Sequence, residues 1–163
     1  MLLFLTPKQI FGQYEWSIQQ LNTTKNALKP NENCYLIHLK LDKTLAYKKA
    51  KKGINLAFVN LKKTPDNIIF KDLNNDGILD TSDLIAIQVL EGAYLKYGAR
   101  EYGINIVWSQ TPVYEWAILS EDKSVSRIQN NKKYAIFNKT KQSFLVYGER
   151  EDNIGQLKWF DDW

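Results

Sequence analysis

The 163-residue chain contains one cysteine and one histidine, so it is poor in the side chains that form redox, metal and nucleophilic centres. Because Cys34 has no second cysteine to pair with, no intrachain disulfide forms, and packing and hydrogen bonds must hold the fold. His38 falls on the same predicted strand face as Cys34 but about 13 Å away by strand rise, too far for a nucleophile–base pair. Phosphate-binding glycine loops and zinc-protease motifs are also missing. The sequence therefore predicts a protein that is not an enzyme.

Long apolar runs are missing as well. Residues 1–5 are apolar but too short for a signal peptide and lack its basic start. No stretch approaches the roughly 18 apolar residues of a membrane helix. We therefore expect a soluble protein with no membrane span and no visible export signal, for which action outside the cell is plausible if it binds calcium. The net charge of +4 is a mild excess that permits an acidic partner without requiring one.

Apolar and aromatic residues are plentiful, at 44% and 13% of the chain, and they recur with a fixed period. Leucines stand at positions 45, 95 and 145, and tyrosines at 47, 97 and 147. A period of fifty residues indicates repeated architecture. We expect one domain, 1–163, with an N-terminal extension at 1–12, which is either a helical turn or a short strand. Its three repeats are 13–62, 63–112 and 113–163.

Within each repeat the apolar residues alternate in twos, which is the period of a β-strand. Leu95 and Tyr97 share one strand face, and Gly98 and Gly103 bracket a polar hairpin tip. Two more strands precede each hairpin: the first recurs as residues 14–18, 67–70 and 114–118, and the second as 34–37, 84–87 and 134–137. The sequence thus predicts an all-β fold of twelve strands.

Twelve short strands in three equal units resemble the β-trefoil superfamily, which includes ricin-type lectins, fibroblast growth factors, fascins and Kunitz soybean inhibitors. The resemblance covers residues 13–163. It implies a barrel of six strands capped by three hairpins, with pseudo-threefold symmetry, because one such unit cannot bury its own apolar face. Ricin-type lectins carry a Gln-x-Trp signature, whereas this chain has the wider spacings Asn105 to Trp108 and Gln156 to Trp159. No lectin sugar ligands are therefore carried over.

The strongest local motif is the segment 72–83, which matches the D-x-[DN]-x-[DN]-G calcium loop. Side-chain oxygens at alternate positions would face the inside of a tight turn made by Gly77. Calcium suits such a cage because it is a hard cation that accepts six to eight oxygens. The sequence predicts Ca²⁺ as a cofactor, and its predicted ligands are Asp72, Asn74, Asp76, the Ile78 carbonyl, Asp80 and Asp83.

This segment resembles the loops of dockerins, in which a helix follows, and of FG-GAP-type repeats, in which a strand follows. The register of fifty favours a strand and puts the loop between the first two strands of the middle unit. The alternative interpretation is a metal-free surface turn rich in Asp, Asn and Gly. One copy in three units indicates a structural clamp or a local binding loop, and not a calcium sensor.

The hairpin tips carry the remaining candidate residues. Lys48, Lys49, Lys51 and Lys52 form a possible patch for an anionic ligand such as sulfated glycan or phosphate. The alternative is a solvated turn that discourages edge pairing. Arg100, Tyr102, Asn105 and Arg150 are candidate ligand-binding residues around a shallow sugar pocket, with Tyr102 as a stacking surface. The alternative role of Asn105 is to hold a neighbouring loop, because Asn55 and Gln156 recur at matching positions.

Two functions follow as hypotheses. The first is a non-catalytic, lectin-like module that binds carbohydrate and carries one structural or ligand-assisting calcium ion. The second is a protein-interaction module, an inhibitor or the receptor-binding part of a toxin or cytokine, acting through its loops. Nucleic acid is not expected as a partner, since the lysine patch has no interleaved aromatic residues.

Overall fold

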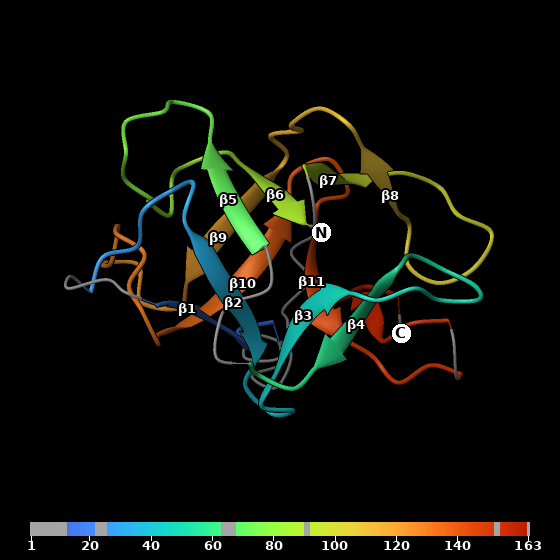
Figure 1. Cartoon of the computed structure of the whole chain (residues 1–163). Coiled ribbons are helices and arrows are strands. Elements are labelled where there is room, and N and C mark those ends of the chain that lie inside the picture. Colours follow the sequence, from blue (N-terminus) through green and yellow to red (C-terminus); the bar gives the residue numbers. More distant parts are fainter. Residues whose placement is uncertain (1–12, 22–25, 63–67, 90–91, 152–153, 163) are drawn as a thin grey trace, which may run out of the picture.

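The computed structural model describes residues 13–21, 26–62, 68–89, 92–151 and 154–162, and every regular element in these ranges is a strand (Figure 1). None of these ranges contains a helix that is long and apolar enough to cross a membrane. The extension 1–12 lies outside the described residues. The twelve strands are β1 (Trp16–Gln20), β2 (Asn33–His38), β3 (Lys43–Tyr47), β4 (Leu56–Val59), β5 (Ile68–Asp72), β6 (Ile85–Val89), β7 (Ala93–Tyr97), β8 (Ile106–Ser109), β9 (Trp116–Ser120), β10 (Lys133–Asn138), β11 (Ser143–Tyr147) and β12 (Leu157–Trp159).

Six of the strands close into an antiparallel barrel. The pairing runs β1–β2–β5–β6–β9–β10 and returns from β10 to β1, so none of these strands is left as a sheet edge. The other six form the hairpins β3–β4, β7–β8 and β11–β12. The expectation of an all-β fold is confirmed at this level, as a closed six-stranded barrel with six additional strands.

The hairpins keep the period of fifty, while the middle unit shifts locally. β3, β7 and β11 begin at residues 43, 93 and 143. Ile18 pairs with Leu36, and Ile118 with Ile136, but Phe70 in β5 pairs with Ile87 in β6. In the middle unit the first strand is therefore displaced by two residues, and the second strand by one, from the expected offset of fifty. This displacement keeps large apolar side chains facing the barrel, and the neighbouring loops absorb the difference.

Two buried tryptophans join the barrel to its hairpins. The Trp16 indole N–H donates to the Leu145 carbonyl at 2.7 Å, and the Trp116 N–H donates to the Leu95 carbonyl at 3.0 Å. Both indoles are fully buried. These hydrogen bonds anchor the hairpin β11–β12 to β1 and the hairpin β7–β8 to β9. The recurring aromatic residues at these positions therefore stabilise the fold.

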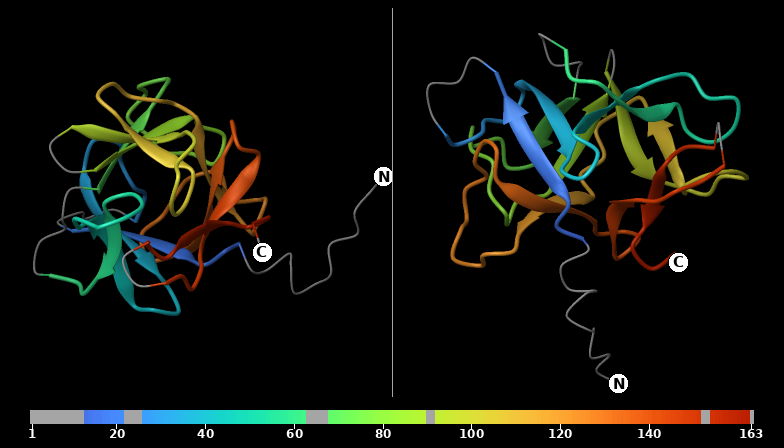
Figure 2. Two further views of the ribbon diagram at one scale, coloured as in Figure 1. Left: turned by 90° about the vertical axis from the view of Figure 1, so that its right-hand side faces the viewer. Right: turned by 90° about the horizontal axis from the view of Figure 1, so that it is seen from below.

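The two ends of the barrel differ in what covers them. The hairpin tips lie at one end, on the right of Figure 1, and the left panel of Figure 2 looks onto them. At the other end run the segments 26–31, 73–84 and 121–132, which together we call the loop end. Leu28, Leu79 and Ile128 from these segments are all buried and close the core there.

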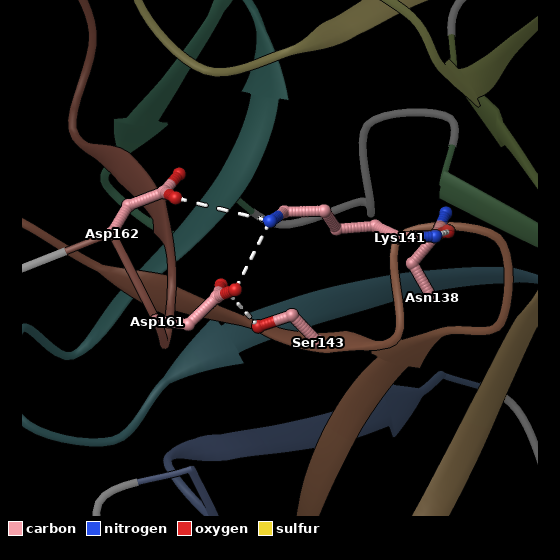
Figure 3. A network of polar contacts seen from close by, with 5 residues as sticks. All are labelled: Asn138, Lys141, Ser143, Asp161 and Asp162. Atoms are coloured by element: carbon pink, nitrogen blue, oxygen red, sulfur yellow. Dashed lines mark hydrogen bonds and ion pairs between the residues drawn. The ribbon is translucent and has the colours of Figure 1, made fainter.

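A polar network holds the residues that follow β12 (Figure 3). The Lys141 ammonium lies 3.0 Å from Asp161 and 3.9 Å from Asp162, and the Ser143 hydroxyl donates to Asp161 at 2.8 Å. The hydrogen bond to Asp161 raises the pKa of Lys141. Asn138 accepts the Lys141 backbone N–H at 2.8 Å. Because the carboxylates are largely exposed, the network anchors the chain end but contributes little free energy.

The tryptophan anchors give a test of the fold. Trp116→Phe removes volume from the core and leaves the Leu95 carbonyl buried without its donor, which should lower the free energy of unfolding by about 2 to 4 kcal/mol. Trp159→Phe is the matched control, because the Trp159 N–H is buried without a hydrogen-bond acceptor in the described part of the chain. Its loss should be smaller by roughly 1 to 3 kcal/mol. Urea denaturation of both variants measures the difference, and equal losses would contradict the role of the hydrogen bond.

Candidate functional site

The tips of the three hairpins meet closely, and two glycines allow this. Gly53 and Gly103 have φ of 79° and 78°, a region that residues with side chains rarely adopt. A Cβ atom would come within 2.5 Å of the Ile154 carbonyl oxygen at Gly53 and within 2.8 Å at Gly103. The Arg100 guanidinium also crosses from the second tip to the first and donates to the Gly53 carbonyl at 2.6 Å. The tips therefore form one continuous surface, which we call the hairpin-tip face.

Two clefts open on the hairpin-tip face. A cleft of about 410 Å³ lies between the first two tips and is lined by Lys51, Lys52, Arg100, Glu101 and Tyr102, among others. A smaller cleft of about 170 Å³ lies between the first and third tips, and its lining includes Lys48, Lys49, Arg150, Glu151 and Gln156. The lysine patch and the predicted residues Arg100, Tyr102 and Arg150, far apart in sequence, thus come together on one face.

The linings of the two clefts on the hairpin-tip face are cationic, and Glu149 of the third tip lies outside both linings. The two clefts are lined by four lysines, two arginines and two carboxylates, an excess of four positive charges. The formal charge of the entire chain is also +4, so the rest of the molecule is balanced. Such a concentration of one sign raises the local concentration of anions and speeds their approach.

The side chains that line the clefts differ in their exposure and in the hydrogen bonds that they already make within the protein. Tyr102 is 42% exposed, and the Lys52 ammonium lies 4.7 Å above the centre of its ring. The Arg100 Nε is buried and has no hydrogen-bond acceptor among the described residues, whereas the Arg150 Nε donates to the Leu157 carbonyl at 3.0 Å. The Asn105 side chain accepts the Arg100 backbone N–H at 3.0 Å, which holds its own hairpin tip.

The calcium-type loop lies at the loop end, between β5 and β6, and a strand follows it. Asp72, at the end of β5, is only 4% exposed. One of its oxygens accepts the Asp76 backbone N–H at 3.2 Å, and the other has no hydrogen-bond partner among the described residues. The turn passes through Gly77 at a φ of 80°. Asp80 likewise has one buried oxygen without a partner in the described ranges.

Negative charge in this loop is incompletely compensated. Burial raises the pKa of Asp72, and the nearby charges of Asp76 and Asp83 raise it further, against the lowering effect of backbone hydrogen bonds. The Asn74 amide nitrogen donates to Asp83 at 3.1 Å and to Asp76 at 3.3 Å, so it bridges these two carboxylates. The Ile78 N–H donates to Asp76 at 2.9 Å. Within the described residues no three His, Cys, Asp or Glu side chains gather as a metal cluster.

A third cleft, of about 660 Å³, lies where β1 meets the hairpin β11–β12, and no sequence motif indicated it. Its lining includes Glu15, His38 and Tyr147. His38 is 1% exposed, with Nδ1 accepting the Leu41 N–H at 3.2 Å and Nε2 at 3.3 Å from Glu15. Because Nδ1 is an acceptor, Nε2 is the ring nitrogen that faces the Glu15 carboxylate, although the two do not form a well-aligned hydrogen bond.

The Cys34 thiol is buried, and its pKa is raised far above the usual range by that burial. It donates to the Ile68 carbonyl at 3.3 Å, on the neighbouring strand. A thiol in such surroundings stays protonated and packs as a small apolar group.

Comparisons with known proteins find no matching protein-family model, no matching curated protein and no matching solved structure. The predicted resemblance to the β-trefoil superfamily, with its ricin-type lectins, fibroblast growth factors and fascins, is therefore wrong as a family assignment. The same holds for the resemblance of the loop 72–83 to dockerins and FG-GAP repeats. The periodic leucines Leu45, Leu95 and Leu145 lie in the hairpin strands β3, β7 and β11 and are fully buried, so they pack the core.

The raised pKa of Asp72 gives a pH-dependent prediction for the metal-free protein. A carboxyl whose pKa is higher in the folded state stabilises the fold below its unfolded pKa, and that stability is lost as the pH rises through the folded pKa. Asp72→Asn removes this loss, because the amide stays neutral and its oxygen can still accept the Asp76 N–H. In chelator, the stability of the variant relative to the native protein should therefore increase from pH 3 to pH 7. Denaturant titrations across this range measure the difference; a constant or falling difference would contradict the prediction.

Proposed function

We propose that the protein is a non-catalytic, lectin-like binding module whose ligand is a carbohydrate carrying negative charge, held at the hairpin-tip face. The observation that carries this proposal is the convergence of four lysines, two arginines and an exposed tyrosine around two adjoining clefts. Sulfate or carboxylate groups of a glycan would be held by charge-assisted hydrogen bonds, the stronger class of hydrogen bond in proteins.

Tyr102 supports a sugar as the body of this ligand. Its ring is 42% exposed at the edge of a cationic cleft, and an exposed aromatic ring offers an apolar face to the C–H groups of a sugar. The Lys52 ammonium lies over the same ring, where an approaching anion would meet its charge. Arg100 is preorganised because its guanidinium is already fixed on the Gly53 carbonyl.

We further propose that the loop 72–83 binds one calcium ion, using the oxygens of Asp72, Asn74, Asp76, the Ile78 carbonyl, Asp80 and Asp83. Support comes from the unpartnered oxygen of the buried Asp72, which belongs to a carboxylate that already faces the loop through Asp76. Burial raises the pKa of Asp72, and the charges of Asp76 and Asp83 raise it further; calcium would compensate the negative charge of all three carboxylates. The three units are taken to be related by a pseudo-threefold axis, since their hairpins begin fifty residues apart.

A glycan array, followed by calorimetry with a heparin hexasaccharide, tests the carbohydrate proposal. Binding should be selective for sulfated over neutral oligosaccharides and should weaken as salt is added. The double variant Lys51→Ala/Lys52→Ala should bind about tenfold or more weakly, because each charge-assisted hydrogen bond contributes about 1.5 to 3 kcal/mol. Tyr102→Ala should bind more weakly without a change in salt dependence.

Lys123→Ala is the matched control for these variants, because Lys123 is an exposed lysine at the loop end. Its affinity for the hexasaccharide should equal that of the native protein. If no glycan on the array binds, or if Lys123→Ala loses as much affinity as the tip variants, the proposal of a carbohydrate site at the hairpin-tip face is wrong.

Calorimetry with calcium chloride tests the metal proposal. Calcium should bind with a measurable heat and raise the melting temperature, because an ion that binds only the folded state stabilises it by about 2.7 kcal/mol at one hundred times Kd. Asp72→Asn should abolish both effects. Asp42→Asn is the control, because Asp42 is an exposed residue with a φ of 51°, a conformation that asparagine adopts readily. If calcium produces neither a heat of binding nor a shift in the melting temperature of the native protein, the loop is a metal-free turn.

A further inference from the structure

The calcium-type loop is bonded to a second loop that the sequence does not connect with it. The Thr81 N–H donates to the Ser126 carbonyl at 2.7 Å, and the Ile128 N–H donates to the Leu79 carbonyl at 2.9 Å. Between these bonds, Asp80 and Arg127 pair as an antiparallel β-bridge. The segment 79–81 of the middle unit thus forms a short strand contact with 126–128 of the last unit.

The contact extends to the first unit. The Leu28 N–H donates to the Ile128 carbonyl at 2.8 Å, and Ala27 pairs with Gln129 as a second isolated bridge. The side chains of Leu28, Leu79 and Ile128 are all buried, at 1%, 1% and 0% exposure. The loop end is therefore a bonded chain of three segments whose apolar side chains close the barrel core.

Predicted metal ligands alternate with the residues that make this contact. Asp80 and Asp83 lie on either side of Thr81, and the Asp83 carboxylate accepts the Asp80 N–H at 2.7 Å. The Asp83 N–H in turn donates to the Asp80 carbonyl at 3.1 Å. An ion that fixes the carboxylates of Asp80 and Asp83 therefore also fixes the backbone that Thr81 and Leu79 present to residues 126–128.

We propose that calcium in the loop 72–83 acts as a structural clamp for the whole loop end, which holds segment 126–128, and through it segment 27–28, against the barrel. This inference rests on the proposed calcium site and adds its role. The loop end and the hairpin-tip face lie at opposite ends of the barrel (Figures 1 and 2). The ion therefore takes no part in holding the ligand at the hairpin-tip face.

Amide hydrogen exchange of the full chain, followed by NMR with calcium chloride or with chelator, measures the clamp directly. At a calcium concentration one hundred times Kd, exchange at Thr81 and Ile128 should slow by about a hundredfold, because local opening must first release the ion. The control amide is Lys139, whose N–H donates to the Glu115 carbonyl in the turn after β10, outside the loop end. Its exchange should change much less.

Two variants and one binding measurement separate the possible outcomes. Asp72→Asn should remove the calcium-dependent slowing at Thr81 and Ile128, and Asp42→Asn should keep it. If calcium binds with a calorimetric heat but slows Lys139 as much as Thr81, the ion stabilises the fold generally and the clamp is wrong. If calcium produces no heat, the metal proposal itself fails, and the clamp with it.

The hexasaccharide affinity should be equal in calcium and in chelator; dependence on calcium would overturn the purely structural role.

Discussion

Closure of the barrel between β1 and β10 is the constraint on which the other features depend. It joins residues more than one hundred positions apart and leaves no barrel strand with a free edge. Once the ring is closed, its two ends need separate covers. The hairpins cover one end through the indole of Trp16 and Trp116, and the loops cover the other through Leu28, Leu79 and Ile128. Each cover then carries one of the two proposed sites.

The separation of the ends gives the two sites different physical characters. At the hairpin-tip face, the backbones meet through glycines, and the long cationic side chains are left at the surface around two clefts. Such a face suits a soluble anionic ligand that approaches from water. At the loop end, the carboxylates of Asp72 and Asp83 are buried, and the surrounding contacts are backbone hydrogen bonds. That arrangement suits an ion that belongs to the fold.

Local sequence patterns predicted the elements well because barrel strands must alternate in polarity. The hairpin strand Ala93–Tyr97 follows from that alternation, whereas the strand Ile85–Val89 after the calcium-type loop follows from the register of fifty. The pattern failed by two residues in the first strand of the middle unit and by one in the second, where Phe70 pairs with Ile87, because pairing register is chosen by cross-strand packing. It also predicted a resemblance to the β-trefoil superfamily that no matching family model, curated protein or solved structure supports. Asn105 shows a further limit: sequence alone could not decide between ligand binding and the hydrogen bond that it makes to the Arg100 backbone.

The sequence by itself determined the number and kind of strands, the three hairpins and the oxygen-rich loop, because these depend on residues close together in the chain. Only the tertiary structure decided which of the candidate residues share a surface. Lys52 lies over Tyr102, and Arg100 reaches Gly53, because barrel closure brings hairpin tips fifty residues apart into contact. The bond between Thr81 and Ser126 has the same origin. Contacts of this kind leave no local pattern, since each side chain or amide is ordinary until its distant partner is in place.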